Sequence, residues 1–246
     1  MNLLAFDTST ESMSIAVART VDGVDHTWQH TGVGGAQAST GLISAVLDLM
    51  QQAQLKMVEL DAICFGSGPG SFTGLRTACS VAQGFAFGAN VPVLPVDSLL
   101  AVAEEARYTA LDNLAHGEVL AMLDARMDEI YAARYGFDAG HWTEVMGSRL
   151  ARPEALQAAA TPRVLAGNVF EAYGERLAAA GVAAAGVQCV TALPTASAML
   201  RLAPQLLAQG RAVSAEHALP LYIRDKVAKT TLEREIEKAA ANRVST

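Results

Sequence analysis

Apolar residues in the first half of the chain recur first with the period of strands and then with alternating strand and helix periods. Met13, Ile15 and Val17, for example, alternate with small or polar residues. The predicted elements are strands at residues 2–6, 13–17 and 24–31, a helix at 38–54, a strand at 61–66, a helix at 71–89, a strand at 91–96 and a helix at 98–107. Three consecutive strands before the alternation indicate an α/β fold with a mixed sheet.

The second half of the chain repeats this order more loosely. Strands are predicted at residues 118–124, 129–137 and 142–150, with alternating helices and strands from there to Leu207. From Asp225 onward a charged run with little apolar periodicity is typical of a tail or a solvated helix. We therefore predict three regions: a first lobe at 1–108, a smaller second lobe at 109–224 and a tail at 225–246.

Two of the predicted helices are apolar almost all round. The helix at 71–89 has Arg76 as its only charge, and the helix at 38–54 has only Asp48. Such helices must be buried, either in a large core or against another protein chain. Because helices of an α/β layer normally expose their outer side, we favour a partner interface, where Gly84 and Gly88 would allow close approach.

The segment GSGPGSFTGLR, from Gly66 to Arg76, lies between an apolar strand and a long helix. Glycines at such a corner permit positive φ and close backbone approach, while Ser71 or Thr73 can cap a helix whose N-terminus favours anions. A phosphate cradle and a tight structural corner are both consistent with the pattern. The segment is not a P-loop, because no Lys-Ser/Thr follows its last glycine and Pro69 lacks an N–H donor.

A second polar cluster follows the first strand, where Asp7, Thr8, Ser9 and Thr10 place a carboxylate and three hydroxyl groups in one turn. Such a turn can hold a phosphate or a hydrated magnesium ion. It can equally be an Asx or Ser/Thr turn that closes a hairpin. The residues alone leave both interpretations open.

His26 and His30 have the spacing of a helical metal site, but their segment is predicted to be a strand. Residues four apart in a strand lie roughly 13 Å from one another, which is too far to share an ion. The remaining histidines are isolated in the sequence. We therefore predict no metal site.

Two further segments carry charge or aromatic residues in a distinctive order. DARMDEIY, from Asp124 to Tyr131, places Arg126 between carboxylates at a predicted turn, where a structural ion pair is favoured over a ligand site. PLYIR, from Pro220 to Arg224, ends the folded part as either a capping strand or a docking segment.

Composition and charge narrow the function classes. The 246 residues include 18 basic and 25 acidic side chains, a formal net charge of -7, so the chain is not expected to grip a nucleic-acid backbone unaided. Three cysteines without a CxxC pair argue against a disulfide scaffold or a zinc knuckle. With no leader peptide or membrane-spanning run in the sequence, we expect a cytoplasmic protein without membrane contact.

Four of these segments occur in the order found in the TsaB (YeaZ) family, which the chain resembles from its first strand to Arg224. They are DTST at Asp7, GSGPGSFTGLR at Gly66, LDARMDEIY at Leu123 and PLYIR at Pro220. The resemblance implies an α/β, two-lobed, actin-like and Hsp70-like ATPase fold (ASKHA, ribonuclease H-like) with mixed sheets. The family pattern has glycine after DARM, where this chain has Asp128.

The resemblance also implies a function. TsaB proteins are non-catalytic paralogues that pair with the catalytic subunit TsaD, joined by the ATPase TsaE. The complex attaches a threonylcarbamoyl group to N6 of the adenosine beside the anticodon of ANN-decoding tRNAs. The chain would be a scaffold or activator that requires no cofactor of its own, with ATP or ADP expected only in the complex. It would form a homodimer when alone and meet tRNA only through the complex.

Two sets of candidate site residues follow. The resemblance assigns the two apolar helices to the subunit interface, and the partner-binding candidates are Leu42, Val46, Leu49, Gly74, Ala78, Val81 and Phe85. The alternative function is a stand-alone ATPase or phosphotransferase, whose nucleotide-binding candidates are Asp7, Thr8, Gly68, Gly70, Ser71 and Thr73. The catalytic relative has a metal-binding histidine pair in its first long helix, whereas residues 38–49 contain no histidine. No catalytic or metal-binding residue is predicted.

Overall fold

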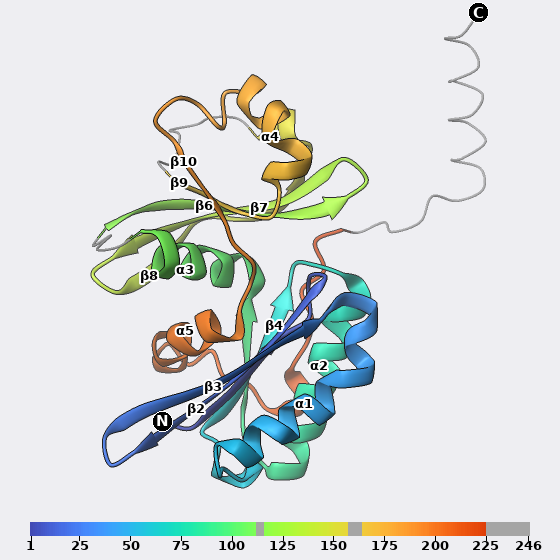
Figure 1. Ribbon diagram of the computed structural model, residues 1–246, viewed down its shortest axis with the longest axis vertical. Helices are drawn as coiled ribbons and strands as arrows, with labels where there is room; N and C mark the ends of the chain where they lie inside the picture. Colours follow the sequence, from blue (N-terminus) through green and yellow to red (C-terminus); the bar gives the residue numbers. More distant parts are fainter. Residues whose placement is uncertain (112–115, 157–163, 225–246) are drawn as a thin grey trace, which may run out of the picture.

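Two five-stranded mixed sheets organise the chain, one in each of two lobes (Figure 1). The computed structural model describes residues 1–111, 116–156 and 164–224. The strand order is β3-β2-β1-β4-β5 in the first sheet and β10-β9-β6-β7-β8 in the second. In each sheet three consecutive strands pair antiparallel, and two later strands extend the sheet in parallel. The predicted α/β fold with mixed sheets is confirmed, and the second half repeats the topology of the first.

The predicted elements are present, with small shifts at their ends. The first half contains β1 (Leu3–Asp7), β2 (Ser12–Val21), β3 (Val24–Val33), α1 (Ala38–Gln52), β4 (Ala62–Gly68), α2 (Phe72–Ala89), β5 (Val93–Asp97) and α3 (Ser98–Ala110). The second contains β6 (His116–Arg126), β7 (Glu129–Asp138), β8 (His141–Ala151), β9 (Val164–Gly167), α4 (Phe170–Ala179), β10 (Gln188–Thr191) and α5 (Ala196–Ala208). Short 3-10 helices are η1 (Gly35–Gln37), η2 (Met57–Glu59), η3 (Pro153–Ala155) and η4 (Ala215–His217). The predicted tail at 225–246 lies outside the described residues.

Side-chain caps fix where three of the helices begin. The Ser71 hydroxyl accepts a hydrogen bond from the Gly74 amide at the start of α2, as one of the two predicted caps would. Asp97 caps α3 and Thr195 caps α5 in the same way. Across the described parts of the chain, no helix is long and apolar enough to cross a membrane.

Two helices, α3 and α5, lie between the sheets, and each packs mainly against the sheet of the other half of the chain (Figure 1). The helix α3 follows the first sheet in the chain but packs against β6, β7 and β9 of the second. Conversely, α5 follows the second sheet but packs against β1, β2 and β4 of the first. The packing therefore crosses the predicted boundaries, since part of 1–108 lies with the second sheet and part of 109–224 with the first.

The remaining helices cover the outer faces of the sheets. Apolar side chains of α1 and α2 pack with those of β1, β2 and β4 in one buried cluster. Those of α4 pack with β6 and β9 in another. A third cluster joins the inner faces of both sheets to α3 and α5, so the lobes share a continuous apolar core.

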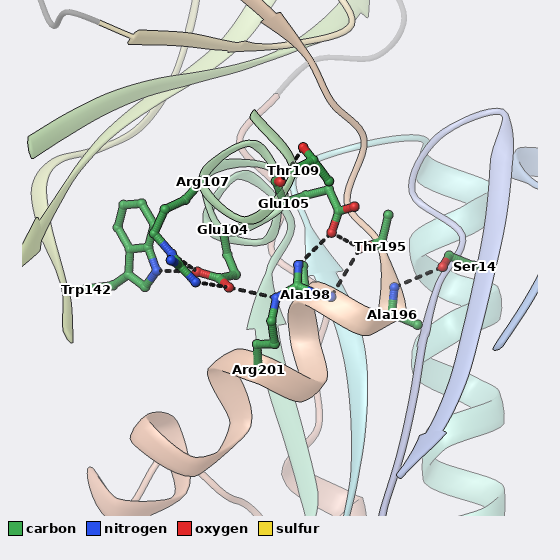
Figure 2. Close-up of polar contacts among 10 residues, drawn as sticks. All are labelled: Ser14, Glu104, Glu105, Arg107, Thr109, Trp142, Thr195, Ala196, Ala198 and Arg201. Carbon is green, nitrogen blue, oxygen red and sulfur yellow. Dashed lines mark hydrogen bonds and ion pairs between the residues drawn. The ribbon is translucent and has the colours of Figure 1, made fainter. Parts of the chain in front are cut away.

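A polar seam reinforces the contact between α3 and α5 (Figure 2). The Glu104 carboxylate, only 3% exposed, accepts hydrogen bonds from Arg107 at 2.8 Å, from Arg201 at 2.7 Å and from the Trp142 indole N–H at 3.0 Å. Burial raises the pKa of Glu104, but the three donors outweigh burial and hold it below its usual range. Because Glu104 belongs to α3 and Arg201 to α5, this seam ties one lobe to the other.

Candidate functional site

Four glycines at the corner between β4 and α2 each lie against another segment of the chain. A Cβ atom at these positions would collide with its neighbour, and Gly68 in addition has φ +118. The nearest atoms would be Asp7 Oδ2 at 1.8 Å for Gly66 and the Leu221 carbonyl oxygen at 2.7 Å for Gly68. They would be Ser9 Cβ and the Ser9 carbonyl oxygen, both at 2.6 Å, for Gly70, and the Thr8 carbonyl oxygen at 1.9 Å for Gly74. The glycine spacing therefore matches close approach by two other segments, as in the structural-corner interpretation.

Asp7 is fully buried where it ends β1. Its Oδ1 accepts hydrogen bonds from the backbone N–H and the hydroxyl of Ser9, at 2.7 and 2.6 Å, and its Oδ2 accepts one from the Ser98 hydroxyl at 3.1 Å. Burial raises the pKa of Asp7 to about 6, although the bonds from Ser9 and Ser98 oppose the rise. The carboxylate thus closes an Asx turn, which is one of the two predicted interpretations.

Thr8 is buried beside Asp7. Its hydroxyl donates to the Gly74 carbonyl at 2.7 Å, which ties the turn after β1 to the first turn of α2. In this conformation neither the Asp7 nor the Thr8 side chain can contact a ligand from solvent.

A cavity of about 500 Å³ lies between the lobes, beside this turn. Its walls include Ser9, Thr10, Gly70, Ser71 and Phe72 from the first lobe, Asp124, Arg126, Tyr131 and Asn168 from the second, and residues 221–224. Of the six nucleotide-binding candidates, only Gly70 and Ser71 are among its lining residues. Gly68 instead faces Leu221, and Thr73 is exposed on the first turn of α2.

The second lobe contributes the β6–β7 hairpin to this cavity. Arg126, Met127 and Asp128 have φ values of +61, +56 and +66, the left-handed conformation that favours glycine. Polar contacts hold the turn: the Asp124 carboxylate accepts from the Arg126 amide at 2.8 Å, and Arg176 pairs with Asp128 at 2.7 Å. The predicted ion pairing at this turn is present, because the Arg126 guanidinium lies 3.2 Å from the Asp124 carboxylate, and both residues border the cavity.

Residues 218–224, which we call the strap, close the cavity from a third side. The Leu221 amide donates to the Ser67 carbonyl at 2.7 Å, and Arg224 pairs with Glu129 of β7 at 2.5 Å. The sequence left open whether PLYIR is a capping strand or a docking segment. It docks, and its docking site is the glycine corner of the same chain. The pairing of Arg224 with Glu129 was not predicted, although both residues lie in segments singled out by the sequence.

The partner-binding candidates on α1 and α2 lie mostly in the core. Five of the seven are buried within the chain: Leu42, Val46, Leu49, Gly74 and Ala78. Their role in partner binding stays a prediction. Val81 and Phe85 are half-buried. The outward face instead presents Ile43 and Leu47 of α1, 48% and 50% exposed, and Phe87 of α2, 85% exposed.

His26 and His30 lie on β3, as predicted, in extended strand conformation. Within the described ranges no group of three or more His, Cys, Asp or Glu side chains is arranged to hold a metal ion.

The fold and the cavity together define a class of protein. Two lobes of the same sheet topology, with exchanged helices and polar turns facing a central cavity, are the architecture of actin-like and Hsp70-like (ASKHA) proteins. A family model described as "TsaD: tRNA N6-adenosine threonylcarbamoyltransferase" matches residues 35–232.

Individual relatives narrow the class to a family. The chain is 32% identical over 233 residues to the "tRNA threonylcarbamoyladenosine biosynthesis protein TsaB" of Escherichia coli, covering 93% of this chain and 96% of that one. The TsaB protein of Haemophilus influenzae is 32% identical and covers 92% of this chain and 95% of its own. The solved structure "YeaZ from Pseudomonas aeruginosa" is 35% identical, with a TM-score of 0.75 over 90% of this chain and 99% of that one. The chain belongs to the TsaB (YeaZ) family, as its motifs predicted.

Proposed function

We propose that the chain takes part in biosynthesis of tRNA threonylcarbamoyladenosine as a non-catalytic subunit that pairs with a TsaD-type catalytic subunit. The observation that carries this proposal is similarity over nearly the full length of proteins named for that biosynthesis. The commitment of Asp7 and Thr8 to internal hydrogen bonds supports a scaffold rather than an enzyme, because both groups are withdrawn from the cavity. The transfer itself would take place on the partner.

The partner would dock on the outward face of α1 and α2. Ile43, Leu47 and Phe87 supply exposed apolar area there, flanked by the half-buried Val81 and Phe85. Gly84 and Gly88 have open space where a side chain would be, so a partner helix could approach the α2 backbone closely. Apolar side chains with polar surroundings are the usual core of such interfaces. In the free chain the same face would pair two copies, and the ATPase TsaE would join only the heteromeric assembly.

The proposal is tested by threonylcarbamoyl transfer to unmodified tRNA. The catalytic paralogue and TsaE are assayed with ATP and an activated threonylcarbamoyl donor, with and without this chain, and light scattering gives the mass of the complex. We expect transfer to depend on the chain and a defined complex to form. Transfer that is equally fast without the chain, with no complex, would reject the scaffold function.

Substitutions on α1 test where the interface with the catalytic subunit lies. Ile43→Asp and Leu47→Asp put a charge on the outward face of α1 without touching the core, so they should abolish both complex formation and the gain in transfer. Val145→Asp is the matched control, because Val145 is 44% exposed on β8 of the other lobe. If the α1 variants still bind the partner while remaining folded, the interface lies elsewhere.

A stand-alone ATPase or phosphotransferase is the second candidate, and the cavity between the lobes is the observation that favours it. Ser9, Gly70 and Ser71 would then face the phosphates. This function requires ATP hydrolysis by the purified chain that is lost in Ser71→Ala and retained in Ser80→Ala, an exposed serine outside the cavity walls. Absence of hydrolysis by the wild-type chain rejects it.

A further inference from the structure

The strap is anchored on the first lobe along most of its length. The Ala218 carbonyl accepts from the Gln83 side-chain amide at 3.0 Å and from the Cys79 thiol at 3.3 Å, both on α2. The Tyr222 ring lies 5.1 Å from that of Phe72, and its hydroxyl accepts from Arg76 Nε at 3.0 Å. Together with the Leu221 amide bond to Ser67, these contacts fix the strap to α2 and β4.

Only the end of the strap reaches the second lobe. The Arg224 guanidinium contacts three groups of the β6–β7 hairpin: the Glu129 carboxylate at 2.5 Å, the Arg126 carbonyl at 3.3 Å and the Met127 sulfur at 3.3 Å. The pair is largely shielded from water, with the Arg224 side chain 13% and the Glu129 side chain 31% exposed. A shielded, charge-assisted contact of this kind is stronger than an exposed surface pair.

The strap and the polar seam lie on different sides of the contact between the lobes. Figure 1 shows the strap, in orange-red, to the right of the gap between the sheets, whereas α3 and α5 lie to the left. The seam of Figure 2 therefore fixes the lobes where α3 and α5 cross, and the strap fixes them beside the cavity. A second charged contact between the lobes beside the cavity is the exposed pair of Arg126 with Glu11, at 3.4 Å.

We propose that the strap is a latch that sets the angle between the two lobes, and that the cavity opens only when the Arg224–Glu129 pair breaks. The seam acts as the hinge, because its contacts are buried in the shared core. Two-lobed proteins commonly close around ligands by hinge motion between their lobes. In this chain the latch already holds the lobes, so the protein presents a single rigid shape. The inference is independent of which partner the α1 and α2 face binds.

The lobe angle can be measured with two spin labels. Cys189 is an exposed native thiol on β10 of the second lobe, whereas Cys64 and Cys79 are buried. Gln51→Cys adds an exposed site on α1 of the first lobe. Labelled chain diluted with unlabelled chain gives the distance distribution within one molecule by pulsed electron resonance, even if two copies pair.

The test compares variants of the latch with a matched arginine. Arg224→Ala, and Glu129→Gln as the milder variant, should raise the population of open conformers about tenfold, which broadens the distribution. Arg149→Ala is the control, since Arg149 is an exposed arginine on β8 of the second lobe, outside the β6–β7 turn. Reversing both charges, with Arg224→Glu and Glu129→Arg together, should restore a narrow distribution.

Amide hydrogen exchange supplies an independent measurement. Release of the latch should speed exchange of the Leu221 amide about tenfold, while amides in the middle of β1 and β4 keep their wild-type rates. Unchanged distance distributions in both latch variants would overturn the proposal. Equal broadening by Arg149→Ala would also overturn it, because the effect would then not depend on the strap.

Discussion

Single residues explain the most specific motif of the chain. The glycines of GSGPGSFTG are required by neighbours that lie far away in sequence, such as Asp7 against Gly66 and Leu221 against Gly68. A glycine motif next to a helix N-terminus is typical of phosphate binding, but here the space above the glycines is filled by the chain itself. The glycine motif could be recognised from the sequence. The neighbouring atoms that leave no room for a Cβ at these positions could not.

Gly74 and Gly84 of α2 differ in the space that a side chain would have. Gly74→Ala should lower the free energy of unfolding by about 3 kcal/mol or more, because its Cβ would lie 1.9 Å from the Thr8 carbonyl oxygen. Gly84→Ala should raise it by roughly 0.5–1 kcal/mol, since the site is open and alanine favours helix. Urea unfolding measures both. A small effect at Gly74 would show that the turn after β1 can move away from α2.

The Asp7 carboxyl should make stability depend on pH. Its pKa of about 6 in the folded chain lies above its ordinary value of 3.8, so the folded state binds more protons between these values. Stability should therefore fall as pH rises through this window, by about 3 kcal/mol in total. Asp7→Asn keeps the acceptor for Ser9 and removes the titration. Unfolding from pH 4 to 7 should show this decline in wild type relative to the variant, and parallel profiles would contradict the raised pKa.

At the scale of elements, periodicity predicted the strands and helices but not which helix face is buried. In α1, Leu42 and Val46 form one apolar stripe and Ile43 and Leu47 form another, one position along. Both stripes satisfy the helical period, and only the position of the sheet decides that the first is core. The α1 residues among the partner-binding candidates belong to the buried stripe for this reason. Likewise, nothing local to α3 predicts that it packs on the second sheet.

The β6–β7 turn also has a feature that the sequence does not predict. Two residues, Met127 and Asp128, join strands paired up to Arg126 and Glu129, which is the geometry of a two-residue turn with positive φ. Glycine in the family pattern at the position of Asp128 fits this conformation. Here Asp128 adopts it while paired with Arg176 of α4, a contact that sequence spacing does not indicate.

The seam between α3 and α5 gives a prediction at this scale. Glu104→Gln keeps the size of the side chain but leaves Arg107 without its anionic partner and Arg201 with Glu105 alone. We expect a loss of about 3 kcal/mol in the free energy of unfolding, because removing one member of a buried ion network leaves the other charges uncompensated. Glu154→Gln, at an exposed ion pair, should leave the urea midpoint nearly unchanged. Equal effects of the two variants would mean that the seam adds no more than a surface pair.

At the scale of the whole molecule, the two lobes have the same sheet topology and share an apolar core. The strap forms one wall of the cavity between them. The resulting surface is acidic overall, with a net charge of -7. Proteins that bind nucleic acid directly gain most of their affinity from cations that neutralise phosphates. We therefore expect the proposed role in tRNA modification to place the main tRNA contacts on a partner subunit.

This argument predicts how tRNA affinity is divided in the proposed complex. The free chain should bind tRNA with a Kd weaker than about 100 µM at about 150 mM salt, while the complex binds far more tightly. Replacing arginines of this chain one at a time, for example Arg126→Ala at the cavity and Arg149→Ala on β8, should change the affinity of the complex less than about twofold. Filter binding over a range of salt concentrations measures both, with the catalytic subunit alone as the control. Micromolar binding by the free chain, or a tenfold loss from either substitution, would place a tRNA site on this subunit despite its acidic charge.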